Sequence, residues 1–365
     1  MSWRTTTWGE VIRLHYGKAL VGGSVDSGPV RVYGTNGPTG FTDAEPQGTG
    51  PSVVVGRKGA YRGIHYAPEP FFVIDTAFYV ESLEGVDMRW VYYALKTVDL
   101  DAIATGSAIP STRREDLYEV KVRLPPRREQ QAIGEVLGAL DDKIAANHRL
   151  QSLAIDQISA LARAAAGTVR LGEVASLHRN SLAPGSFGAE NVWHYSLPSF
   201  DEGKVRLEGS SGIMSAKHRL DRPVVLVSKL NPRIPRVWPV MRLKEGVSVT
   251  SPEFMAMAPT QGFSVASLTA ALRSEQFTTS LLSLVAGTTG SHQRVKPMEV
   301  MELGIPDMRT LSRAALETIE ALELMSVSSS EENTTLTTIR DELLPQLMSG
   351  RITVKDAERR VEEEI

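Results

Sequence analysis

The 365-residue sequence contains no cysteine. This absence excludes disulfide bonds, zinc held by cysteine and a thiol nucleophile, and it fits a reducing compartment such as the cytoplasm. No apolar run approaches the roughly 18 residues that cross a bilayer. The opening MSWRTTTWGEVIRL has no apolar core behind a charged segment. We therefore expect neither a membrane contact nor a secretory signal.

Several signatures of bound cofactors are also missing. The sequence has no Gly-x-x-x-x-Gly-Lys-Ser/Thr loop, and its seven histidines show no pair at metal-ligand spacing. We therefore predict that the chain itself binds no nucleotide cofactor and no metal. One acidic constellation leaves an alternative open. Asp101, Glu119 and Lys121 are of the residue types that hold Mg²⁺ in some nucleases.

Charge of either sign is nearly balanced, with a net charge of -3, which argues against a protein that coats nucleic acid indiscriminately. The balance hides an uneven distribution. Residues 203–244 carry ten lysines and arginines against two acids, and residues 356–365 carry five acids against two arginines. The sequence therefore combines a basic segment with an acidic C-terminal end.

Two segments have the apolar spacing of long helices. In 127–166 and in 307–350, apolar residues recur at steps of three and four. Leu153 and Ile158 continue the first stripe, whereas the polar stretch 326–335 could interrupt the second. Each segment is about 40 residues, or about 60 Å of helix, and is apolar on one face. We expect the two to pair as an antiparallel coiled coil. The residues predicted to make this pairing are Ile133, Leu137, Leu140, Ile144, Leu316, Ile319, Leu343 and Leu347.

The segments before the two helices are rich in β-branched and aromatic residues, and they share landmarks. Thr-Gly-Ser occurs at 105–107 and again 184 positions later, and Leu124-Pro125 is matched 181 positions later by Ile305-Pro306. Shared order indicates an internal duplication. We predict an α+β fold in which two mixed α/β domains are separated by two long antiparallel helices. The expected parts are a first domain at 1–126, a central helix at 127–166, a second domain at 167–306, a distal helix at 307–350 and an acidic tail at 351–365.

Basic residues gather with Asn, Gln and His in short segments of both domains. Arg, Asn and Gln can pair with base edges in DNA, and Lys can hold phosphates. The candidate DNA-binding residues of the first domain are Arg57, Lys58, Arg62, His65, Arg113 and Arg114. Those of the second domain are Lys229, Asn231, Arg233, Arg236, His292, Gln293, Arg294 and Lys296. Such clusters at matching places in a duplicated chain favour a nucleic-acid partner.

The sequence resembles the specificity subunits of type I restriction-modification systems. The block LPPRREQQAIGEVLGALDDKIAANHRL at 124–150 is very similar to that family's central helix and the segment before it. The segments at 73–80, 228–238, 289–297 and 340–352 also resemble family segments. The distal helix departs from the pattern, because it lacks the Glu-Gln pair and the Asp-Asp-Lys-Ile of the central one.

The resemblance implies two target-recognition domains, each reading one half of a split, asymmetric sequence in double-stranded DNA. The paired helices would set the spacing between the two halves of the DNA sequence, and they would dock two adenine-methyltransferase subunits. Those partners would bind S-adenosylmethionine, and a restriction or motor subunit using ATP and Mg²⁺ would join for cleavage. This chain would be non-catalytic. The alternative from another class is a coiled-coil scaffold whose end domains bind proteins.

Overall fold

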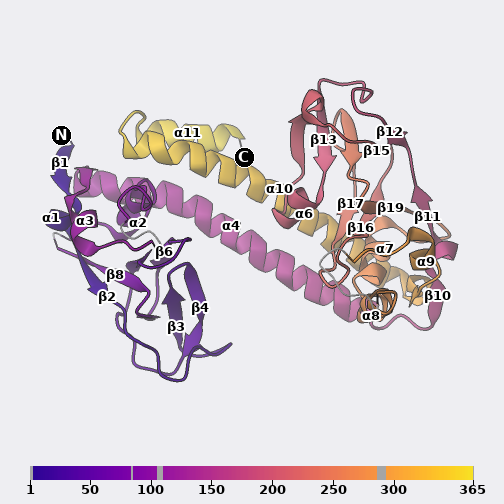
Figure 1. Ribbon diagram of the computed structural model, residues 1–365, viewed down its shortest axis with the longest axis horizontal. Helices are drawn as coiled ribbons and strands as arrows, with labels where there is room; N and C mark the ends of the chain where they lie inside the picture. Colours follow the sequence, from indigo (N-terminus) through magenta and orange to yellow (C-terminus); the bar gives the residue numbers. More distant parts are fainter. Residues whose placement is uncertain (1–2, 84, 105–109, 286–292, 365) are drawn as a thin grey trace. The chain divides into compact units, whose positions relative to one another are not determined.

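The computed structural model describes residues 3–83, 85–104, 110–285 and 293–364 (Figure 1). The chain divides into two compact units. Unit 1 comprises Met1–Lys143 and Thr335–Ile365, and unit 2 comprises Ile144–Thr334. Each unit therefore contains one mixed domain and a stretch of each long helix. Both Thr-Gly-Ser landmarks, and with them the candidate residue His292, lie outside the described residues.

Unit 1 is built on an antiparallel sheet of strand order β2-β8-β5-β6. A second sheet has the order β4-β3-β7, and β1 pairs with β9. The strands are β1 (Arg4–Thr7), β2 (Ile12–Tyr16), β3 (Val30–Gly34), β4 (Gly37–Thr42), β5 (Ser52–Gly56), β6 (Ile64–Ala67), β7 (Phe71–Val73), β8 (Ala77–Ser82) and β9 (Lys121–Leu124). The helices of this domain are α1 (Trp8–Val11), α2 (Met88–Lys96) and α3 (Arg114–Glu119). Every residue of β5 is buried, which explains its unbroken valine run.

Unit 2 repeats this plan. Its antiparallel sheet has the order β11-β19-β16-β17, and β10 pairs with β20. A larger sheet of order β12-β15-β18-β13-β14 is added. The strands are β10 (Thr168–Arg170), β11 (Ala175–His178), β12 (Ser181–Leu182), β13 (Asn191–Tyr195), β14 (Arg206–Gly209), β15 (Lys217–Leu220), β16 (Val224–Ser228), β17 (Val237–Val240), β18 (Val247–Thr250), β19 (Phe254–Pro259) and β20 (Gly304–Pro306). The helices are α5 (Leu171–Val174), α6 (Leu197–Asp201), η1 (Ser210–Gly212), α7 (Val265–Leu272), α8 (Glu275–Ser283), α9 (Pro297–Met301) and η2 (Met308–Thr310).

The repeat can be followed through the local sequence. Trp8-Gly9-Glu10-Val11 forms α1, and Leu171-Gly172-Glu173-Val174 forms α5 at the same place between two strands. The first strand of each domain pairs with its last, β1 with β9 and β10 with β20. The predicted α+β fold with an internal repeat is therefore confirmed.

The two long helices are α4 (Arg127–Ala162) and α10 (Arg313–Met348), and Figure 1 shows both as unbroken. The polar stretch 326–335 does not interrupt α10. Gly350 has a φ of +67°, and the amides of Gly350 and Arg351 donate to the carbonyls of Leu347 and Gln346. This Schellman motif ends α10. Beyond it, α11 (Val354–Glu364) gives most of the acidic tail a helical conformation.

Two contacts within unit 2 show that α4 and α10 run antiparallel there. The Asn147 amide donates to Asn333 over 2.9 Å, and the Gln151 amide donates to the Ser326 carbonyl over 3.4 Å. The residue numbers therefore rise along α4 as they fall along α10. In unit 1 the Arg340 guanidinium of α10 lies 2.6 Å from Asp141 of α4. Of the predicted pairing residues, Ile144 and Leu316 are partly buried, and the others are buried: Ile133, Leu137, Leu140, Ile319, Leu343 and Leu347.

One position of the predicted stripe is wrong. Leu153 is 65% exposed, whereas the adjacent Ala154 is 2% exposed. The apolar stripe passes through Asn147, a buried polar residue, before it reaches Ala154 and Ile158. Leu153 lies one position before the buried Ala154, so the apolar pattern placed the buried stripe one residue too early. Among the described residues, no helix has both the length and the apolar character needed to span a membrane.

Candidate nucleic-acid interface

In each domain, the loop that follows the central strand is joined to the segment that leads back toward a long helix. In unit 1 the Arg57 amide donates to Thr76 over 2.9 Å, and the Arg57 carbonyl accepts from Thr112 over 2.9 Å. In unit 2 the Lys229 amide donates to Glu253 over 2.8 Å, and the Lys229 carbonyl accepts from Val295 over 3.1 Å. The two domains thus share the same pair of backbone hydrogen bonds, which closes this loop against its neighbouring segments. By these hydrogen bonds, Arg57 corresponds to Lys229.

This closure brings together basic clusters that are far apart in the sequence. A β-bridge joins Lys58 to Ser111 in unit 1, and another joins Leu230 to Arg294 in unit 2. The predicted residues near 57 therefore lie beside those near 113, and the residues near 229 lie beside those near 294. We call these two places the first basic site and the second basic site.

The first basic site is organised around an aromatic ring. The guanidinium carbons of Arg57 and Arg114 lie 4.8 and 4.5 Å from the centroid of the Tyr16 ring. Tyr16 is 43% exposed, and Lys58 next to Arg57 is exposed. Arg113 is paired with Asp116 at 2.7 Å. Cation–π contacts can hold arginines in place while their remaining donors face solvent. Tyr16 was not among the predicted site residues.

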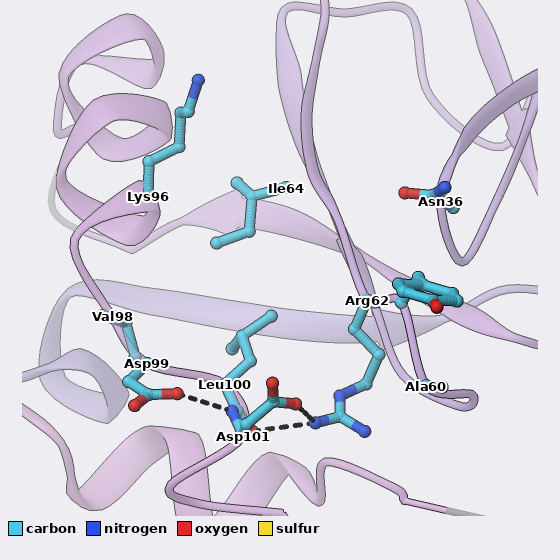
Figure 2. A pocket seen from close by; sticks show the side chains of 10 residues that line it. Asn36, Ala60, Arg62, Ile64, Lys96, Val98, Asp99, Leu100 and Asp101 are labelled. Carbon is cyan, nitrogen blue, oxygen red and sulfur yellow. Dashed lines mark hydrogen bonds and ion pairs between the residues drawn. The ribbon is translucent and has the colours of Figure 1, made fainter. Parts of the chain in front are cut away.

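Two predicted residues of the first domain have internal roles. The Arg62 side chain is 1% exposed and is held by Gly59, Leu100 and Asp101. Figure 2 shows Arg62 reaching toward Asp101, beside a cavity of 470 Å³. The His65 ring fills the space where a Cβ on Gly63 would lie, 2.1 Å from Nε2. Burial, with a smaller contribution from Lys96, lowers the pKa of His65. We therefore assign neither residue to DNA contact.

The second basic site has a different make-up. Arg233 is exposed, and no ion pair of its guanidinium is found within the described part of the chain. Arg294 is 60% exposed and lies 2.9 Å from Glu253, and Lys296 is 80% exposed and lies 2.8 Å from Glu299. The backbone of Asn231, with a φ of +50°, donates to the Gln293 carbonyl over 2.8 Å. These exposed donors can reach a ligand from solvent.

Arg236, like Arg62, is held inside its domain by an aspartate. Its guanidinium donates twice to Asp201, over 2.7 and 2.9 Å, and its side chain is 12% exposed. The hydrogen bond from Arg236 is the main cause that lowers the pKa of Asp201. Arg236 thus ties the loop after β16 to the end of α6, much as Arg62 ties its own loop to Asp101.

The residues of the nuclease alternative do not form a recognisable metal centre. Asp101 accepts the ion pair from Arg62, and Glu119 and Lys121 lie at the end of α3 and the start of β9. Among the residues that the structure describes, no group of three or more His, Asp or Glu is placed to hold a metal ion.

Comparison with known proteins agrees with this arrangement. Residues 2–154 match the model of the type I restriction modification DNA specificity domain. The matched part of the chain, residues 2–154, is therefore similar to this DNA specificity domain. The EcoprrI specificity subunit of a type I restriction enzyme from Escherichia coli is 25% identical over 141 residues. That match covers 37% of this chain and 35% of the relative, so it spans about a third of the curated protein's length.

A solved structure extends the likeness to nearly the whole chain. The crystal structure of the S subunit of a type I restriction-modification system from M. genitalium has a TM-score of 0.68. The match covers 95% of this chain and 96% of that chain, at 17% sequence identity. This chain therefore shares its fold with the M. genitalium protein.

Proposed function

We propose that this chain is the sequence-specific DNA-recognition subunit of a type I restriction-modification complex. The observation that carries the proposal is the repeated closure of the two basic sites. It sets exposed cations beside the end of a core strand in each domain. Lysine and arginine at a surface bind phosphates, and arginine and asparagine also read base edges. The domain-family match supports the same function.

The two sites carry different side chains, which supports recognition of an asymmetric, bipartite sequence. The first offers Arg57 and Arg114 at the Tyr16 ring, with the exposed Lys58 next to Arg57. The second offers Arg233 and Arg294 on another loop frame. Two unlike surfaces favour two unlike half-sites. We include Arg233 and Arg294 as base-reading candidates and Lys58 as a phosphate contact.

The proposal assigns the chemistry to partner subunits. Two methyltransferase subunits would bind S-adenosylmethionine and dock on the helices α4 and α10. A restriction or motor subunit would bring ATP and Mg²⁺. The chain itself would be non-catalytic, bind no cofactor, and act in the cytoplasm, where the DNA is. Its direct role would be to hold DNA in register for the methyltransferases.

The test compares adenine methylation across the genome of the source cell with and without this gene. We expect one bipartite motif to lose its methylation when the gene is removed. A gel shift with the purified methyltransferase complex adds a residue-level readout. Arg233→Ala and Arg294→Ala should each weaken binding to that motif by about 10-fold or more, since one base contact contributes about 1–3 kcal/mol.

Arg313→Ala serves as the control for loss of one positive charge, because Arg313 is 93% exposed, pairs with Glu317 of the same helix and belongs to neither basic site. It should leave DNA binding unchanged. An unchanged methylome after deletion would contradict the proposal. A chain that binds its partners and shows no salt-dependent DNA binding would instead favour the scaffold alternative.

A further inference from the structure

The second basic site contains a cavity lined by one predicted residue, Lys229, and by several residues that the sequence did not predict. It has a volume of 280 Å³ and is lined by His178, Arg179, His218, Lys229 and Pro297, together with Leu177 and residues of β19. The polar lining comes from the end of β11, from β15 and from the residue after β16. The cavity thus lies where the two sheets of the second domain meet.

Equivalent positions in the first domain are filled rather than open. The α1 and α5 motifs align Tyr16 with Arg179, and the hydrogen bonds of the two loops align Arg57 with Lys229. The return segments align Arg114, the first residue of α3, with Pro297, the first residue of α9. In the first domain the Tyr16 ring therefore occupies the place between two arginines. In the second, an arginine, a lysine and a proline surround empty space.

The lining of this cavity is cationic and incompletely satisfied. No carboxylate belongs to it, and the nearby Glu253 is already engaged by Arg294 at 2.9 Å. Burial lowers the pKa of Lys229, Glu253 opposes the shift, and Arg179 and Arg294 add to it. Outside the lining, Asp221 lies 3.6 Å from His178 Nε2, which also lies 3.1 Å from the Arg219 carbonyl.

His218 gives a second indication of a ligand. Its Nδ1 atom is buried and has no hydrogen-bond partner within the described residues. Burial, followed by Lys229, Arg179 and His178, lowers the pKa of His218. Cations crowd together here at an electrostatic cost, and an anion with several acceptor oxygens would relieve it and satisfy the histidine.

We propose that this cavity binds one phosphate group of the DNA backbone, held by Lys229, Arg179 and His218. The inference rests on the proposed DNA-binding function and adds a division of labour to it. The cavity fixes the position of the duplex, and Arg233 and Arg294 on the adjoining segments read the bases. Phosphate contacts carry no sequence information, so this site contributes affinity without altering the target motif.

The test measures binding of the full chain to a random-sequence duplex over a range of salt concentrations. Loss of one phosphate contact lowers the slope of log K against log salt by about 0.9. We expect Lys229→Gln to show this change and to weaken binding by the same factor for every duplex. Arg179→Tyr, which places the residue of the first domain in the cavity, should do the same. Arg179 is exposed, so this second variant guards against a failure to fold.

Lys204→Gln is the control for charge, because Lys204 is exposed in the same basic segment and does not line the cavity. It should preserve the salt slope. Wild-type slopes in both Lys229→Gln and Arg179→Tyr would overturn the phosphate site. A wild-type chain that binds no DNA either alone or in the purified methyltransferase complex would instead overturn the proposed function.

The source of the phosphate is tested by nuclear magnetic resonance of the His218 ring. Its resonances should shift on addition of duplex DNA in the wild type and not in Lys229→Gln. A shift with inorganic phosphate alone, and none with DNA, would identify a free-phosphate site and contradict the assignment to DNA.

Discussion

The two halves of the chain share a pattern of backbone hydrogen bonds. They differ in the additional sheet and in the side chains at equivalent positions. Both close a four-stranded antiparallel sheet and pair their first strand with their last. The first half adds a three-stranded sheet, and the second adds a five-stranded one. At one equivalent position the first half has Tyr16 and the second has Arg179. Backbone hydrogen bonds depend little on side-chain identity, so a common frame can present two different recognition surfaces.

The largest predicted difference concerns the ion pairs that the long helices make in each unit. In unit 2 Arg273 of the domain pairs at 2.9 Å with Glu323 of α10, whose side chain is 1% exposed. In unit 1 the pair joins the two helices, Arg340 of α10 with Asp141 of α4, and Asp141 is 26% exposed and also accepts a hydrogen bond from Tyr93 of the domain. Arg273→Met should cost about 3 kcal/mol near neutral pH, because it leaves a buried charge unpaired. Arg340→Met should cost less, and chemical unfolding of the full chain measures both.

The same pair gives a pH dependence with a definite sign. Burial raises the pKa of Glu323, and Arg273 opposes that shift. Without Arg273 the folded state should bind the proton more tightly than the unfolded state does. The stability lost in Arg273→Met should therefore shrink as the pH falls toward the ordinary range of a glutamate. An equal loss at every pH, or a larger loss in Arg340→Met, would contradict this account.

The next prediction compares the polar middle of the helix pair with its apolar ends. Asn147 is 1% exposed and donates to Asn333 and Glu332. Asn147→Leu alone should destabilise the chain by about 1–3 kcal/mol, because it leaves buried polar groups unsatisfied. Adding Asn333→Leu should recover part of that loss. A double variant that is no more stable than the single one argues against a direct coupling of the two asparagines.

A smaller loss of stability is expected for the two arginines that are held inside the domains, one in each half. Arg62 and Arg236 are each held by an aspartate and largely buried. Arg62→Gln and Arg236→Gln should each lower the free energy of unfolding by about 1–2 kcal/mol. The salt slope of DNA binding should not change, since neither arginine is assigned to a phosphate. A slope lowered by either variant would return that arginine to the DNA-contact set.

The smallest effect tests the aromatic centre of the first basic site. Tyr16→Leu removes the ring on which Arg57 and Arg114 rest, and an exposed cation–π contact contributes about 0.5–1 kcal/mol. DNA affinity should fall a few-fold, and Tyr16→Phe should behave as the wild type. Equal losses in both variants would point to the hydroxyl group instead of the ring face.

The sequence patterns correctly predicted the large-scale organisation of the chain. The one-face stripes predicted α4 and α10, and the ordered landmarks predicted the duplication. The failure at Leu153 has a physical cause, because the buried stripe is polar at Asn147 and a hydrophobicity pattern cannot follow it there. The short motif Gly-Glu-Val at 9–11 and again at 172–174 was an unused signal of the same repeat.

The candidate site could be predicted only in outline. Residue type and spacing brought out the basic clusters, but they could not tell which arginines are held internally. Arg62 and Arg236 bind aspartates 39 and 35 positions away, and only the folded chain brings these partners together. Tyr16, Arg179 and His218 were missed for the same reason, since each joins its site through strand pairing. The Thr-Gly-Ser landmarks lie outside the described residues, so their structural equivalence stays a prediction.

The central claim is that each half reads its own part of one DNA sequence. The most direct measurement maps the adenine-methylation motif in cells that carry Arg57→Ala together with Arg114→Ala, and separately in cells that carry Arg233→Ala together with Arg294→Ala. The account predicts that the two variants relax or weaken opposite halves of a bipartite motif. Changes confined to the same half, or an unaltered motif in both, would contradict it.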